Sequence, residues 1–123
     1  MKRKIYFAHP RSKIGTKREE RIIKILESRG YEVINPFTYY GNSMYKINAV
    51  IRDRRLYDMC DEVFCWFPKN HSRKIGTSIE LYWAYLDGKH ITVLTYNKKH
   101  DFLDFYANKI YYTYQSFIKD RNI

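Results

Sequence analysis

Short apolar runs alternate with segments of helical periodicity along most of this chain. The apolar runs are continuous, which is typical of strands buried on both faces of a parallel sheet, and they span 4–8, 31–35, 61–67 and 91–96. Between them, apolar residues recur at helical spacing in 16–30, 47–59 and 77–87. The alternation predicts a three-layer α/β fold, in which helices cover both faces of a central, mostly parallel sheet. We expect four or five strands in the flavodoxin-like or Rossmann-like order 2-1-3-4-5.

Capping and turn residues mark the ends of these predicted elements. Thr16-Lys-Arg-Glu19 is a capping-box pattern, and Gly30 has the position of a glycine that ends a helix. The aromatic, turn-rich segment 37–45 is predicted to be a loop over the sheet. In the tail, 101–120, the pattern is ambiguous, because its first part fits a helix while Tyr111-Tyr-Thr-Tyr114 fits a short strand.

The composition is that of one folded domain, 1–123, since an aromatic fraction of 18% is far above that of a disordered chain. No segment resembles a signal peptide or reaches the length of a membrane span, so we expect a cytoplasmic protein with no membrane partner. Cys60 and Cys65 are poorly placed for a disulfide and too few for a zinc site. No metal-ligand spacing occurs in the sequence, so neither a metal nor a cofactor is expected.

The net charge of +10 has three interpretations. The basic residues could bind nucleic acid, form a solvated surface, or serve in part a phosphate-bearing ligand. Because they are scattered rather than arranged in a stripe, nucleic acid is not the favoured partner.

Glu80 is the most informative single position. It follows Gly76-Thr-Ser78 and precedes Leu81–Leu86, so it is expected in the first turn of a helix that is apolar almost all round and buried between the sheet and a second surface. A carboxylate there is costly unless it is paired or used, although a glutamate favoured by the helix dipole is the simpler alternative. The preceding segment 69–75 is polar and basic, and it is predicted to be a loop at the mouth of this helix. Together these features indicate a site for an anionic small molecule.

Asp53 is a second carboxylate in an unusual position. Its neighbours at three and four residues are apolar, so we expect it near the buried side of its helix, with Arg52 and Arg55 pointing away. It either pairs with an arginine or takes part in chemistry. Two carboxyl groups about 5 Å apart suit cleavage of a bond to an anomeric carbon, because one stabilises or attacks the oxocarbenium-like centre while the other protonates the leaving group.

Three motifs carry a resemblance to a known family: Ile5-Tyr-Phe-Ala8, Arg52-Asp53 ahead of Asp61-Glu-Val-Phe64, and Gly76-Thr-Ser-Ile-Glu80 with Ala84 and Gly88-Lys89. In this order, over about residues 4–95, the chain resembles the nucleoside 2-deoxyribosyltransferase superfamily, which includes the 2′-deoxynucleoside 5′-monophosphate N-hydrolases. The resemblance implies that Glu80 is a nucleophile forming a glycosyl-enzyme intermediate and that Asp53 handles the proton of the leaving base. It implies that Tyr6 orients the glutamate, although an inward-facing strand aromatic is the simpler interpretation of Tyr6.

The residues around the predicted mouth are expected to bind the substrate. Lys74 stands where the transferases carry an aspartate, and an ammonium beside a helix N-terminus suits a 5′-phosphate, which favours hydrolysis of a nucleotide over transfer. A solvated basic loop is the alternative. The remaining expected substrate contacts are His9, Arg11, Lys13, Gly76 and Ser78.

The assembly is expected to be a homo-oligomer, most simply a dimer. Tyr82, Trp83 and Tyr85 exceed what one face of a sheet can cover, so this helix should pack against a second copy. The resemblance also implies that the C-terminal tail reaches a neighbouring subunit's site.

The sequence thus leaves three functions open. The first is an enzyme that hydrolyses or transfers at the N-glycosidic bond of a (deoxy)nucleoside 5′-monophosphate through a Glu nucleophile. The second is a non-catalytic module that binds or senses a nucleotide on the same fold. The third is a basic nucleic-acid-binding protein.

Overall fold

The computed structural model describes residues 2–40, 48–69, 75–96 and 101–120. Its centre is a sheet of five strands in the order β2-β1-β3-β4-β5, with every neighbouring pair parallel. The strands are β1 (Arg3–Ala8), β2 (Tyr31–Ile34), β3 (Glu62–Phe67), β4 (His90–Thr95) and β5 (Lys109–Tyr111). The predicted α/β class and strand order are therefore confirmed, with β5 as the fifth strand at the edge.

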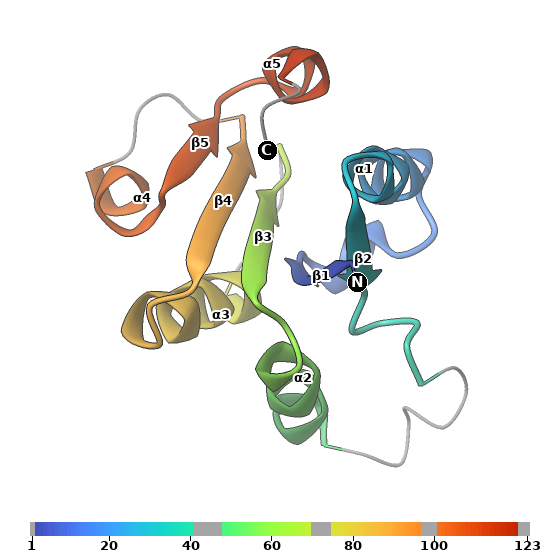
Figure 1. Ribbon diagram of the computed structural model, residues 1–123, viewed down its shortest axis with the longest axis vertical. Coiled ribbons are helices and arrows are strands. Elements are labelled where there is room, and N and C mark those ends of the chain that lie inside the picture. Colours follow the sequence, from blue (N-terminus) through green and yellow to red (C-terminus); the bar gives the residue numbers. More distant parts are fainter. Residues whose placement is uncertain (1, 41–47, 70–74, 97–100, 121–123) are drawn as a thin grey trace.

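Helices cover both faces of this sheet (Figure 1). The helices are α1 (Lys17–Ser28), α2 (Ala49–Asp58), α3 (Ile75–Leu86), α4 (Asp101–Tyr106) and α5 (Tyr114–Lys119), with a short 3-10 helix η1 (Arg11–Lys13) after β1. In Figure 1, α1 and α5 lie on one side of the strands, and α2 and α3 lie on the other. The tail of ambiguous pattern thus holds a helix, a strand and a further helix.

Two hydrophobic cores fill the spaces between these layers, because successive side chains of a strand point to opposite faces. In β1, Tyr6 and Ala8 belong to the core beneath α2 and α3, whereas Ile5 and Phe7 belong to the core beneath α1 and α5. Every residue of β3 is buried, as expected of a central parallel strand. Side chains on the two faces of β1 therefore lie in different cores, so candidate site residues on opposite faces cannot meet.

The predicted ends of α1 are confirmed, although only one half of the capping box forms. The Thr16 side chain accepts a hydrogen bond from the Glu19 amide, and Gly30 has a φ of +95° at the turn into β2. The left-handed region costs a residue with a side chain more than it costs glycine. The predicted loop over 37–45 is described only as far as Tyr40, where the chain forms turns.

The expected start of α3 was wrong. The helix begins at Ile75, so Gly76 lies inside its first turn and Glu80 in its second turn. In the single chain the outer side of α3 is open, and Ile75 and Leu86 are 76% and 63% exposed. Among the described residues, no helix is long and apolar enough to cross a membrane.

Candidate active site

A cluster of polar side chains from β1, α2 and α3 lies in the core between these elements. The inward side of α3 has the spacing i, i+3, i+4, i+7, and its buried residues are Thr77, Glu80, Leu81 and Ala84. Glu80 thereby takes a core position although it is ionisable, and it is only 6% exposed. Polar groups from the neighbouring elements surround it: Tyr6 from β1, and Arg52 and Asp53 from α2.

Tyr6 holds the Glu80 side chain from the sheet. Its hydroxyl donates a hydrogen bond to Oε2 of Glu80, and its ring packs edge-on against Tyr57 with the ring centroids 6.0 Å apart. Burial, together with the Glu80 and Asp53 carboxyl groups, raises the pKa of Tyr6 far above its ordinary value. Tyr6 therefore stays protonated and keeps the proton that it donates to Glu80.

Arg52 and Asp53 approach Glu80 from α2. Both Nε and an Nη of Arg52 lie 2.7 Å from Oδ1 of Asp53. The expectation that Arg52 points away from the core was wrong, since Arg52 is 2% exposed and shares the buried side of α2 with Leu56 and Tyr57. Burial is tolerated because the guanidinium is ion-paired and its Cζ lies 5.6 Å from the ring centre of Phe37.

The Glu80 carboxyl group retains its proton at neutral pH. Burial, with repulsion from Asp53 and a hydrogen bond to Asp53, raises the pKa of Glu80 to about 8, although the Tyr6 hydroxyl and the Arg52 charge both lower it. The two carboxyl groups therefore lie close enough to interact directly, and repulsion between their ionised forms favours a proton on the pair.

Beneath this pair lies Cys65 of β3, which is fully buried. Burial and the neighbouring Glu80 raise the pKa of the Cys65 thiol, so the thiol is neither ionised nor a candidate nucleophile. Both cysteines are free, as expected of residues so placed. Among the residues that the structure describes, no group of His, Cys, Asp and Glu could hold a metal ion.

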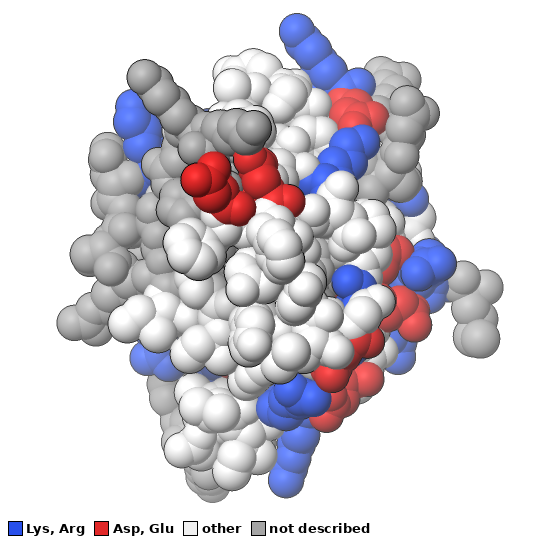
Figure 2. Space-filling view, turned by 90° about the vertical axis from the view of Figure 1, so that its left-hand side faces the viewer, with Lys and Arg blue, Asp and Glu red and all other residues white. Residues whose placement is uncertain are grey.

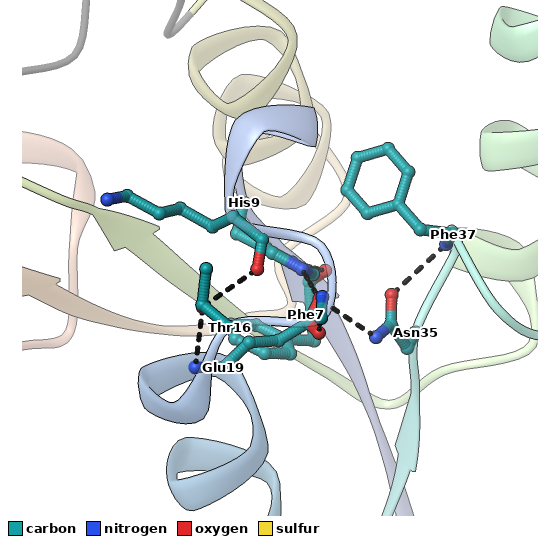
Figure 3. Close-up of polar contacts among 8 residues, drawn as sticks. Phe7, His9, Thr16, Glu19, Asn35 and Phe37 are labelled. Carbon is teal, nitrogen blue, oxygen red and sulfur yellow. Dashed lines mark hydrogen bonds and ion pairs between the residues drawn. The ribbon is translucent and has the colours of Figure 1, made fainter.

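His9 lies on the other side of β1 from Glu80, although it was expected to contact the substrate. Its ring stacks on Phe7 with centroids 3.9 Å apart, its Nδ1 lies 2.9 Å from the Phe7 carbonyl oxygen, and its Nε2 lies 2.6 Å from Oε2 of Glu19 (Figure 3). Asn35 and the Gly15 amide also donate hydrogen bonds to Glu19. His9 is thus enclosed in a network that fixes the turn between β1 and α1, and both of its ring nitrogens are occupied.

The other expected substrate contacts lie after the C-terminal end of β1 and in the first turn of α3. Arg11 and Ser78 are exposed, and Lys13 is half-buried in η1. Gly76 is exposed in the first turn of α3, and a side chain there would meet nothing within 4 Å. Lys74 lies outside the described residues. The structure therefore brings Tyr6, Asp53 and Glu80 together and does not bring His9 to them.

Among the residues that the structure describes, sequence reasoning missed three buried charged residues, which are Arg52, Glu19 and Glu62. Sequence reasoning places a helical arginine on the solvent side, because arginine is almost never fully buried unless it is paired. The signal that could have found it was the adjacent Asp53, which needed a partner. Glu19 was read as part of a capping box, yet its side chain binds His9 rather than the Thr16 amide.

Solved structures of known proteins share this fold. A 2-deoxyribosyltransferase from Bacillus psychrosaccharolyticus has a TM-score of 0.74 at 17% identity, over 95% of this chain and 91% of that chain. A CMP N-glycosidase from Clostridium botulinum has a TM-score of 0.64 at 24% identity, over 95% and 96% of the two chains. A 2-deoxyribosyltransferase from Leishmania mexicana has a TM-score of 0.59 at 19% identity, over 79% and 67%. No protein-family model and no curated protein matches the sequence.

Proposed function

We propose that this chain, which has the fold of the nucleoside 2-deoxyribosyltransferases, hydrolyses the N-glycosidic bond of a (deoxy)nucleoside 5′-monophosphate. The observation that carries the proposal is the interacting pair of the buried Glu80 and the half-buried Asp53, with Tyr6 donating a hydrogen bond to Glu80. A pair of carboxyl groups that shares one proton can supply both a nucleophile and an acid. The structural similarity to a CMP N-glycosidase and to two deoxyribosyltransferases supports the same reaction class.

The proposed reaction begins with movement of the shared proton from Glu80 to Asp53 along their hydrogen bond. The Glu80 carboxylate then attacks C1′ of the sugar while the C1′–N bond breaks, and Asp53 gives the proton to the departing base. In the second half, water attacks C1′ and breaks the bond to Glu80, and its proton passes to Asp53. Tyr6 donates a hydrogen bond to Glu80 throughout, which holds the carboxyl group at the angle of attack.

Basic residues near the ends of β1 and α3 support a monophosphate as substrate. Arg11 and Lys13 belong to η1, which directly follows β1, and Lys74 directly precedes α3 in the sequence. In parallel α/β sheets, ligands bind beyond the carboxyl ends of the strands, where these segments begin. Gly76 and Ser78 of the first turn of α3 belong to the same proposed contact set.

The test is incubation of the protein with nucleosides and nucleoside monophosphates, with free base measured by chromatography. We expect base release from a monophosphate, no release by Glu80→Ala, and retained binding of the nucleotide by that variant. Mass spectrometry with a slow substrate should show a sugar-phosphate adduct on Glu80. Binding without turnover by the wild-type protein would overturn the proposal in favour of a nucleotide-binding module.

We also propose that the protein is a dimer formed through α3 and α4. Large apolar side chains on these two helices are at least 40% exposed, and they are Ile75, Ile79, Tyr82, Tyr85, Leu86, Phe102 and Phe105. Ring contacts between Tyr82 and Tyr106, and between Tyr85 and Phe105, join them into one surface. A standard interface buries about 800 Å² on each partner, and a surface of several large, exposed apolar side chains suits such a contact.

A further inference from the structure

The pair of carboxyl groups in the candidate site is asymmetric in its surroundings. Glu80 receives a neutral donor, the Tyr6 hydroxyl, and rests above the Cys65 thiol. Asp53 instead meets a buried guanidinium, with Nε and Nη of Arg52 both 2.7 Å from its Oδ1. Within the described part of the chain, these four groups from β1, β3 and α2 are the ionisable and charged groups that face Glu80.

The geometry of the ion pair leaves one oxygen of Asp53 available. Because the two donors of Arg52 converge on Oδ1, Oδ2 is the oxygen that can take part in the hydrogen bond with Glu80. A carboxyl group that accepts two charge-assisted hydrogen bonds on one oxygen is stabilised in its ionised form. The Arg52 charge therefore opposes protonation of the pair.

We propose that Arg52 is a positioning residue that weakens the hold of the Glu80–Asp53 pair on its shared proton, through its buried ion pair with Asp53. This inference rests on the proposed function for its catalytic meaning, because the Glu80 carboxylate can attack C1′ only after its proton has left. Arg52 itself touches Asp53 and Phe37, and it acts on Glu80 through the pair.

The burial of Arg52 strengthens this effect. The guanidinium is 2% exposed, so water and salt screen its charge little at a distance of 2.7 Å from Asp53. Burial raises the pKa of Glu80, and Arg52 is among the groups that lower it. Removing the Arg52 charge leaves two carboxyl groups with no counter-ion, so the pair should bind its shared proton more tightly.

The experiment is a titration of the unliganded protein by NMR, with ¹³C at the glutamate side-chain carboxyl carbons and the Glu80 signal assigned from Glu80→Gln. We expect Glu80 to titrate with a pKa near 8 in the wild-type protein. In Arg52→Met its titration should move upward by about 1 pH unit or more. Arg52→Lys should return it toward the wild-type value, because the charge is kept.

Two further variants make the outcome decisive. Arg55→Met removes an exposed arginine from the same helix, and it should leave the Glu80 titration unchanged. Arg52→Gln keeps a donor for Asp53 without the charge, so it replaces Arg52→Met if that variant does not fold. An unchanged or lowered Glu80 titration without the Arg52 charge would overturn the inference.

The titration uses no substrate, so its result is independent of whether the protein is an N-glycosidase. If turnover is found, the alkaline limb of kcat/KM should move upward in Arg52→Gln by the same amount as the Glu80 titration. A titration that shifts in a protein without turnover would support the role of Arg52 and overturn only the proposed reaction.

Discussion

The proton on Glu80 links the candidate site to the stability of the whole chain. In the unfolded chain the pKa of this carboxyl group is about 4.3, whereas burial raises it to about 8 in the folded protein. Between about pH 5 and 8 the folded protein holds a proton that the unfolded chain has lost. The contribution of Glu80 to stability must therefore fall as the pH rises through this range.

Glu80→Gln should remove this dependence, because the amide does not titrate. We expect the free energy of unfolding of the variant, relative to wild type, to increase from pH 5 to pH 8 by an amount on the order of a few kcal/mol. Denaturant unfolding at several pH values measures the difference. Glu27→Gln, an exposed change in α1, is the matched control and should show no such trend. A flat difference for Glu80→Gln would contradict a raised pKa.

The contribution of Asp53 to kcat/KM should be largest for substrates whose base must be protonated in order to leave. Asp53→Asn cannot deliver the proton, so turnover of a substrate with a poor leaving base should fall by about 100-fold or more. A substrate whose base departs readily as an anion should lose much less. The comparison of kcat/KM for two such substrates is the measurement. An equal loss on both would mean that Asp53 only shapes the pocket.

The sequence predicted the centre of the site better than its surroundings. Glu80 and Tyr6 lie in motifs whose order and spacing could be read, and the apolar neighbours of Asp53 placed it near the core. Arg52 could not be placed, because periodicity gives an angle around the helix and not the ion pair that permits burial. His9 was placed in the mouth from its position after a strand, but strand alternation and the Glu19 side chain determine its actual environment.

Among the elements, those up to β4 were mostly predicted from the sequence, whereas the short helices of the tail were not. The strands β1 to β4 and the helix α1 had clear patterns and clear ends. Helices α4 and α5 have only six residues each, which is less than two helical turns and too short for a periodic pattern to emerge. The start of α3 was misplaced because Gly76 was read as a turn, whereas its backbone has ordinary helical geometry.

The two glycines Gly30 and Gly76 therefore give opposite predictions. Gly30→Ala forces a side chain into a backbone with φ of +95°, so it should destabilise the protein by about 1 kcal/mol. Gly76→Ala occupies open space inside a helix and should stabilise it by about 0.5–1 kcal/mol. Each variant is compared with wild type by thermal or denaturant unfolding. If both variants changed the free energy of unfolding in the same direction, backbone conformation would not explain their effects.

For the whole molecule, the exposed apolar surface of α3 and α4 predicts self-association. Figure 2 shows the side of α4 and β5, where a broad uncharged surface is bordered by side chains of both charges. In a chain with a net charge of +10, an uncharged surface is where two copies can meet with the least repulsion.

Light scattering should accordingly give the mass of a dimer for the wild-type protein. Tyr82→Lys places a charge at the middle of the apolar surface and should give monomers. Ile118→Lys, at a similarly exposed position on α5, should leave the dimer intact. A wild-type monomer, or equal dissociation by both changes, would refute the proposed interface.

Chemical labelling of the Cys65 thiol beneath Glu80 can report how often the candidate site opens. Cys65 is fully buried below α3, so a thiol reagent reaches it only when α3 separates from β3. The variant Cys60→Ser leaves Cys65 as the remaining thiol. Its labelling rate therefore measures how often α3 separates from β3. A nucleotide that bridges α2, α3 and β1 should slow this labelling many-fold, so ligands can be ranked by how firmly they close the site, with no chemical step required.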